Sequence, residues 1–243
     1  MKWHPSVTHF EAALFLIFLL ANDPLPSKPP AWRLPLARFV TVEAQNESVR
    51  LARKSAAWNG LVDRYDIRCG DLRDPAVLRE EERFDLILGS PPYFPLGTGV
   101  ESTHPQKLAC RFEVRGTVAD YCRTAVRHLA PGGVFACVFP IRPDDQHQRV
   151  RDGAQAAGLT ILRMRSVVLR EGDAPLLGLF LMNRADDLPE DLRTAVTLRE
   201  FDNLSYEEIA EVMDCPVGTV RSRIFRAREA IDNRIRPMLD GEG

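Results

Sequence analysis

Long apolar runs and paired cysteines are both missing from this sequence of 243 residues. The longest uninterrupted apolar run, residues 12–21, has ten residues, whereas a helix that spans a membrane needs about 20. The five cysteines are scattered without any CxxC or Cys/His spacing, so the sequence predicts neither a disulfide framework nor a zinc site. We therefore expect a cytoplasmic protein with no metal and no membrane attachment.

The segment before residue 38 has little regular pattern. Lys2 is the only lysine or arginine before the apolar run, and no small-x-small cleavage site follows it, which disfavours a signal peptide. Five prolines between residues 24 and 35 exclude a persistent helix or central strand there. We expect residues 1–37 to form an irregular segment, with the apolar run as a short core helix.

From residue 38 onward, strand-like and helix-like patterns alternate, which predicts a parallel sheet covered by helices. The expected strands are residues 39–43, 65–69, 84–88, 134–139, 160–168 and 175–182, and the expected helices are residues 47–58, 117–129 and 148–157. Pro131, Gly132 and Gly133 predict a turn before the fourth strand. The sequence thus favours an α/β domain over residues 38–184.

Charge is distributed unevenly along the tail. Residues 186–214 contain ten acids against two arginines, and residues 216–237 contain six arginines against two acids. A basic stripe of this kind on a chain whose net charge is -2 is typical of a surface that meets nucleic acid.

The tail also has the pattern of two helices joined by a break. Ser205 followed by Glu208 is a capping box, in which each side chain can bond an otherwise unpaired backbone N–H at a helix start. Residues 214–216 interrupt the helical pattern, and apolar residues at helical spacing resume at Val217. The sequence therefore predicts a small all-α helix-turn-helix domain over residues 188–239.

One face of the second helix combines basic, small polar and aromatic side chains. It consists of Arg221, Ser222, Phe225 and Arg226, flanked by Arg223 and Arg228. Arginine binds phosphates or guanine edges, and short side chains can reach base edges in the major groove. A solvated charged face is the alternative, but an aromatic ring among arginines favours a face that another molecule covers. We expect this face to bind DNA.

The stretch LPEDLRTAVTLREFDNLSYEEIAEVMDCPVGTVRSRIFRAREAIDNR resembles region 4 of extracytoplasmic-function (sigma-E-like) RNA polymerase sigma factors. The resemblance implies that Arg221, Ser222, Phe225 and Arg226 read the -35 element of promoter DNA. It also implies docking of the preceding helices on the flap of the RNA polymerase core, and an anti-sigma factor as a further partner. Nothing upstream resembles region 2, which in that family melts the -10 element, so we do not expect this chain to initiate transcription alone.

Three expected strands end in residues that suit a nucleoside site. Glu43 ends the first, Asp71 and Leu72 follow the second, and the third is followed by Ser90, Pro91, Pro92 and Tyr93. Open parallel sheets bind ligands at the carboxyl ends of their strands. An acid there can accept ribose hydroxyls, and a diproline turn with a polar and an aromatic side chain can hold an extruded base. Taken singly, these residues also fit a helix cap, a solvated loop and a plain turn.

Together with YDIRCGDL and FDLILGSPPYF, this arrangement makes the segment 39–182 similar to class I S-adenosylmethionine-dependent methyltransferases, nearest to the bacterial tRNA adenine-N6 enzymes. The resemblance implies a Rossmann-like fold, S-adenosylmethionine as cofactor, tRNA as partner, and catalysis at Ser90, Pro91, Pro92 and Tyr93. The sequence departs from the family in two ways. Ser90 stands where the family has asparagine or aspartate, and no glycine precedes Gly60, although the family binds its cofactor with a glycine-rich loop after the first strand. The fold is therefore expected to be incomplete at its N-terminus, with a damaged cofactor site.

Three hypotheses follow. The first is a promoter-binding sigma region 4 module on a methyltransferase-like scaffold. The second is an adenine-N6 methyltransferase whose tail grips nucleic acid. The third is a fusion of two truncated reading frames, with a folded tail and an unstable front, which a thermal melt would distinguish from a protein with one cooperative core.

Overall fold

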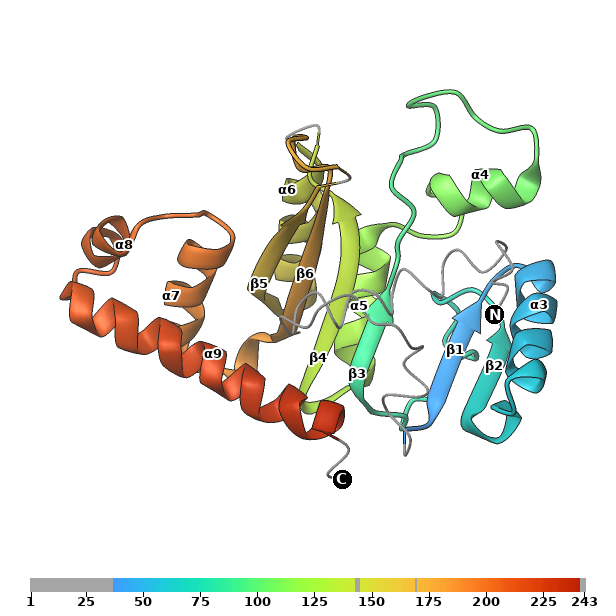
Figure 1. The fold of residues 1–243 in the computed structure, drawn as a ribbon, viewed down its shortest axis with the longest axis horizontal. Coiled ribbons are helices and arrows are strands. Elements are labelled where there is room, and N and C mark those ends of the chain that lie inside the picture. The colour runs from blue at the N-terminus through green and yellow to red at the C-terminus, as the bar shows by residue number, and fades with distance from the viewer. Residues whose placement is uncertain (1–36, 143–144, 169, 241–243) are drawn as a thin grey trace.

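The computed structural model describes residues 37–142, 145–168 and 170–240 (Figure 1). The apolar run and the proline-rich stretch before residue 37 lie outside the described residues. In chain order the elements are β1 (Phe39–Glu43), α3 (Asn46–Trp58), the 3-10 helix η1 (Val62–Arg64), β2 (Tyr65–Cys69), β3 (Phe84–Gly89), α4 (Pro105–Arg111), α5 (Val118–His128), β4 (Leu129–Pro140), α6 (Asp145–Ala157), β5 (Leu159–Val167), β6 (Leu177–Arg184), the 3-10 helix η2 (Ala185–Asp187), α7 (Glu190–Glu200), α8 (Tyr206–Val212) and α9 (Val217–Asp240).

The described strands form two sheets. β1 and β2 pair in parallel, and the second sheet has the order β3-β4-β6-β5. β3 and β4 are parallel, but β6 is antiparallel to both of its neighbours. The predicted α/β class followed by a helical part is confirmed, whereas the expectation of a wholly parallel sheet is wrong for β6, which runs against the other strands of its sheet. Only residues 168–176 join β5 to β6, which is shorter than the dozen or more residues that a parallel crossover needs.

The larger sheet is buried on both faces, because successive side chains of a strand point to opposite sides. Phe135, Cys137 and Phe139 of β4 share one core cluster with apolar residues of α5 and α6. The alternate residues of β4 face the other way, into a second cluster that contains residues from the tail: Leu188, Val196 of α7 and Ala227 of α9. Helices of the tail therefore cover one face of the sheet and share its core (Figure 1).

Two further local features differ from the sequence-based expectation. The short helix α4 has no counterpart among the predicted elements; it begins at Pro105, a residue well suited to a first helical turn. The expected turn at Pro131, Gly132 and Gly133 lies inside β4, where it makes an irregularity: Phe84 pairs with Leu129, whereas two residues later Leu86 pairs with Val134. No helix in the described part of the chain is long and apolar enough to cross a membrane.

Candidate functional sites

The helix-turn-helix begins where the capping box predicts it. The Ser205 hydroxyl accepts a hydrogen bond from the Glu208 backbone N–H at 3.2 Å, and the Glu208 carboxylate accepts one from the Ser205 backbone N–H at 2.7 Å. Asp214, with φ of 46°, supplies the left-handed residue that ends α8 and turns the chain into α9. The capping box thus fixes where α8 begins, and Asp214 sets the turn from α8 into α9.

One side of α9 packs into the protein. Val220 and Ile224 lie in a small core with Ile209 of α8, and Ala227 belongs to the cluster that the tail shares with the sheet. These three α9 residues are spaced by four and three positions, so they lie on one face of the helix. That buried side fixes which residues of α9 face outward.

The outward side of α9 displays the predicted DNA-binding residues. Arg221, Ser222, Phe225 and Arg226 are all exposed, and the Phe225 side chain is 64% exposed. The Arg221 guanidinium lies 5.5 Å from the centre of the Tyr206 ring, which supports its stem from α8. The Ser222 hydroxyl donates to the Thr219 carbonyl at 2.9 Å, so its lone pairs remain as acceptors.

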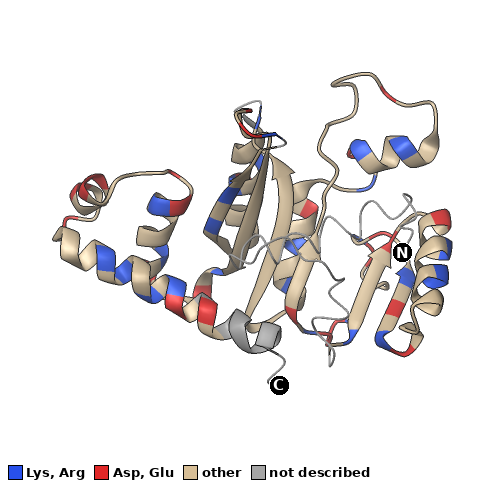
Figure 2. Cartoon of the chain, viewed as in Figure 1, with Lys and Arg blue, Asp and Glu red and all other residues tan. Residues whose placement is uncertain are grey.

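The two flanking arginines have a different position. Arg223 donates to the Asp191 carboxylate at 2.9 Å, and Arg228 forms an ion pair with Glu200. Both acids belong to α7, so these arginines fasten α9 to α7 within the protein. In Figure 2, lysine and arginine follow α9 while α8 carries acidic residues, so the basic character of the tail is concentrated on the second helix.

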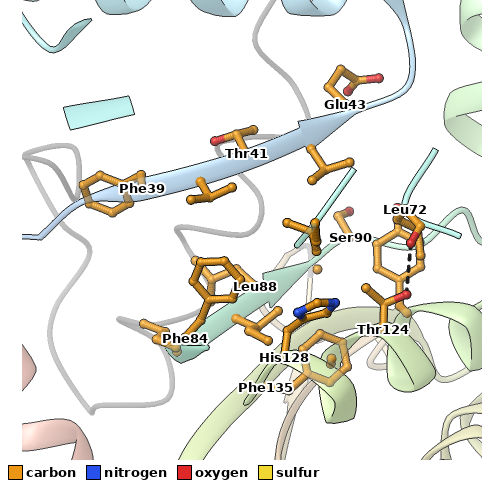
Figure 3. Close-up of a pocket in the computed structure, with 18 of the residues that line it drawn as sticks. Phe39, Thr41, Glu43, Leu72, Phe84, Leu88, Ser90, Thr124, His128 and Phe135 are labelled. Carbon is orange, nitrogen blue, oxygen red and sulfur yellow. Dashed lines mark hydrogen bonds between the residues drawn. The ribbon is translucent and has the colours of Figure 1, made fainter. Parts of the chain in front are cut away.

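The second candidate site lies between the two sheets. A hollow of about 360 Å³, which we call the interstrand cleft, is bordered by β1 on one side and β3 on the other, with Leu72, Tyr121 and His128 among its other lining residues (Figure 3). At the carboxyl ends of these strands it adjoins a smaller hollow of about 70 Å³, which we call the end pocket. The end pocket brings together Glu43, Leu72, Ser90 and Pro92, four of the residues predicted from the sequence.

The other predicted residues of this site lie beside the hollows. The Asp71 carboxylate accepts hydrogen bonds from Arg73 at 2.6 and 2.9 Å, and this contact lowers the pKa of Asp71. The Tyr93 ring packs against Phe139, with ring centres 5.8 Å apart, and burial raises the pKa of its hydroxyl. Pro91 is buried. Asp71, Pro91 and Tyr93 do not line either hollow, and their proposed roles stay predictions.

Glu43 is the acid best placed for a ligand. Its Oε1 accepts from the Gln45 backbone N–H at 2.8 Å, and a second carboxylate oxygen remains to accept from a ligand hydroxyl. Tyr121 of α5 lines the same pocket, and burial, with smaller contributions from Glu43 and Asp71, raises the pKa of its phenol. The hydroxyl of Tyr121 therefore stays protonated and able to donate.

Sequence reasoning did not find Tyr121 or Arg115. Arg115 comes from the loop before α5, lines the end pocket and donates to the Ala44 carbonyl at 2.5 Å. Tyr121, Thr124 and His128 are spaced by three and four positions on α5, which was the available signal that one face of this helix lines a cleft. Thr124 also ties the cleft wall together, because its hydroxyl donates to the Leu72 carbonyl at 3.2 Å (Figure 3).

The groups that line the end pocket suit the adenosine part of a cofactor such as S-adenosylmethionine. A carboxylate at a strand end, with donors and an aromatic side chain beside it, suits the ribose and base of adenosine. No glycine-rich loop lies among the described residues that line the space between β1 and β3. The methionine end of S-adenosylmethionine, which such a loop binds, therefore has no site among them. No group of His, Cys, Asp and Glu that could hold a metal ion occurs among the described residues.

Comparison with known proteins separates the two parts of the chain. Residues 181–231 match the family model described as Sigma-70, region 4. The ECF RNA polymerase sigma-E factors of Escherichia coli (strain K12) and Salmonella typhi are 76% identical to this chain over 54 residues, which is 22% of this chain and 28% of theirs. The chain thus spans little more than a quarter of the length of the curated relatives that it matches.

Solved structures are similar to this chain only at low sequence identity. TrmN from Thermus thermophilus is 20% identical, with a TM-score of 0.40, over 60% of this chain and 36% of its own. A predicted O-methyltransferase from Agrobacterium tumefaciens is 19% identical, with a TM-score of 0.46, over 70% of this chain and 79% of its own.

Proposed function

We propose that this protein binds promoter DNA through the exposed face of α9 and that the α/β domain holds this helix in a fixed orientation. The observation that carries the proposal is the arrangement of Arg221, Phe225 and Arg226 on one exposed face of a helix whose opposite side is buried. The match to sigma region 4 supports double-stranded promoter DNA as the ligand.

The chemistry of this face suits the major groove. Exposed arginines can contact phosphates or make paired hydrogen bonds to guanine, and an exposed aromatic ring can cover a thymine methyl group. An aromatic side chain that is 64% exposed also gains by being covered. Arg223 and Arg228 are expected to contribute by fastening the helix rather than by contacting bases, since both are paired with acids of α7.

RNA polymerase is the proposed protein partner, since the curated relatives are RNA polymerase sigma factors. The surface that can receive it is restricted, because Val196 of α7 and Ala227 of α9 are buried in the core cluster that the tail shares with the sheet. Docking on the polymerase flap, and competition by an anti-sigma factor, would have to use the remaining surface of α7 and α8.

The test is a titration of a duplex that contains a sigma-E-type -35 element, at fixed salt, with the full chain. Arg226→Ala is expected to weaken binding by about 1 to 3 kcal/mol, roughly a 5- to 150-fold rise in Kd, if Arg226 makes a paired contact to a base edge. Arg127→Ala is the matched control, since Arg127 is exposed on α5, over the opposite face of the sheet.

Two results would contradict the proposal. If the Arg226→Ala variant binds the -35 duplex as tightly as the unchanged protein, Arg226 makes no base contact. If the unchanged protein binds the -35 duplex and a scrambled duplex equally tightly, it does not recognise the promoter sequence, and its binding to DNA is driven by charge alone.

A second candidate function is methyl transfer to adenine N6 in tRNA, with the end pocket as the nucleoside site. It is supported by the convergence of Glu43, Ser90 and Pro92 at one pocket. S-adenosylmethionine would supply the methyl group when bound; Glu43 would hold the ribose, and Ser90 would orient the target amino group. Since the described residues fit only the adenosine half of the cofactor, binding and orientation are the roles that they would have.

Calorimetric titration with S-adenosylmethionine tests this candidate. Saturable binding that Glu43→Gln weakens would support it. Glu47→Gln is the control, because Glu47 is exposed on α3 and paired with Arg50. A folded protein that takes up no S-adenosylmethionine would refute it.

A further inference from the structure

Two arginines of β5 lie on the face of the sheet that the tail covers. Arg163 pairs with Leu181 of β6, and Arg165 pairs with Leu179. Residues directly opposite each other in an antiparallel pair point to the same face of the sheet. Leu179 and Leu181 both belong to the cluster that contains Val196 of α7. The two arginines therefore lie on the side of α7 and α9.

The same two arginines lie close to the acid that pairs with α9. Burial and the positive charge of Arg163 lower the pKa of Arg165, whereas the Glu200 carboxylate of α7 raises it. Glu200 also forms the ion pair with Arg228 of α9. Arginines of β5 and α9 are thus grouped at the place where α7 contacts both elements.

This group adjoins the face of α9 that we assign to DNA. Arg221 and Arg228 are seven positions apart, about two helical turns, so they lie on the same side of α9. A recognition helix contacts bases with its N-terminal residues, and the major groove is about 12 Å wide. Arg228 lies about 10 Å further along α9 than Arg221, which brings the junction with β5 near the phosphates that border the groove.

A group of like charges in this position favours a polyanion. Arg163 and Arg165 are half-buried, and like charges repel more strongly where less water surrounds them. Glu200 carries a single negative charge and interacts with both Arg165 and Arg228. Duplex DNA, which carries one negative charge per about 1.7 Å of its axis, has the charge density that such a group attracts.

We propose that Arg163 and Arg165 bind phosphates of the duplex beside the -35 element, a role that rests on the proposed binding of promoter DNA by α9. The α/β domain then forms part of the DNA-binding surface, in addition to holding α9 in its orientation. Because phosphate contacts do not read the sequence, the two arginines add affinity without adding specificity.

The test is the salt dependence of binding by the full chain, measured with a duplex that extends well beyond the -35 element on both sides. Arg163→Gln combined with Arg165→Gln should reduce the slope of log K against the logarithm of the salt concentration by about 2. The same double variant should raise Kd about 10- to 60-fold near 0.1 M salt. Its preference for the -35 duplex over a scrambled duplex should stay unchanged.

The matched control is Arg123→Gln combined with Arg127→Gln. It removes the same amount of charge from two exposed positions of α5, which packs on the opposite face of the sheet. If the β5 double variant and this control have the same slope and the same Kd, the β5 arginines bind no phosphate and the proposal is overturned.

Failure of promoter recognition gives a different result. It appears as equal affinity of the unchanged protein for the -35 duplex and the scrambled duplex, whatever the β5 variant does. A slope that the β5 variant reduces by about 2 would then still support the phosphate contacts. An unchanged slope together with a preference for the -35 duplex would overturn those contacts alone.

Lysine at the same two positions keeps the charge and gives a second measurement if the glutamine variant does not fold. In a chain with Arg163→Lys and Arg165→Lys, a saturating duplex should protect both new amines from acetylation, because phosphates would cover them. Lys54, exposed on α3, should react equally with and without the duplex. Equal acetylation at positions 163 and 165 with and without the duplex would overturn the proposal.

Discussion

Removal of two methyl groups from the core between α7 and the sheet should lower the stability of the whole protein. Val196 is fully buried and belongs to the cluster that contains Leu162, Leu181 and Ala227. Burial of a methyl or methylene group contributes about 0.8 kcal/mol, and the cavity left behind adds to the loss. Val196→Ala should therefore destabilise the protein by about 2 to 3 kcal/mol.

Differential scanning calorimetry of the full chain measures this effect. At about 2 to 4 °C per kcal/mol for a domain of this size, the Tm should fall by roughly 4 to 12 °C. If about 200 residues unfold as one unit, the enthalpy should be ~140 kcal/mol, whereas a tail of about 50 residues unfolding alone gives ~35 kcal/mol. Val212→Ala makes the same chemical change at a position that is 63% exposed, and should leave the Tm nearly unchanged.

The reasoning fails if the scan resolves two transitions and Val196→Ala moves only the smaller one. That result would mean that the tail folds independently of the sheet, as in the hypothesis of two fused reading frames. A single large transition that Val196→Ala leaves in place would equally contradict the shared core.

Two further substitutions test local contacts by urea denaturation. Ser205→Ala removes the cap of α8 and should cost about 1 kcal/mol, and an unchanged urea midpoint would contradict the capping role. Arg68 holds the pKa of Glu82 at about 2, below its ordinary value of 4.5, through hydrogen bonds of 2.7 and 2.8 Å. A depressed folded-state pKa stabilises the protein above the unfolded pKa, and this stability is lost as pH falls from about 4.5 toward 2. Glu82→Gln should therefore cost about 1.5 to 3 kcal/mol at pH 7 and progressively less below pH 4.5; a difference independent of pH would refute this assignment.

Local signals predicted most of the individual elements. The strands at residues 39–43 and 65–69 have the predicted bounds, and the capping box marks the start of α8. These features depend on side-chain alternation and on bonds between residues three positions apart, both of which are visible in one sequence. The antiparallel pairing of β5 and β6 needed a different observation, the length of the connection between them.

The site was predicted where its residues follow directly from strand ends. Glu43 and Ser90 each occur at or just after the end of a strand, so the topology of a parallel sheet is enough to bring them to one edge. Tyr121 reaches the same pocket from α5, across a distance in sequence that no local rule covers. The sequence also could not predict which arginines of α9 pair within the protein. Arg223 and Arg228 pair with acids of α7 that lie 32 and 28 residues away in the sequence.

Ala227 shows why the tail and the sheet must be considered together. Helical spacing assigns Ala227 to the buried side of α9 but does not say what covers it. In the structure it belongs to the core cluster that contains Val196 of α7 and residues of the sheet, although it follows directly after Phe225 and Arg226 on the exposed face. A rigid helix cannot turn one of these sides without turning the other, so the packing of Ala227 fixes the direction in which the basic face points. The DNA-binding orientation proposed for this protein is thus set by the sheet as well as by the helix-turn-helix, and any change at this contact should alter stability and DNA affinity together.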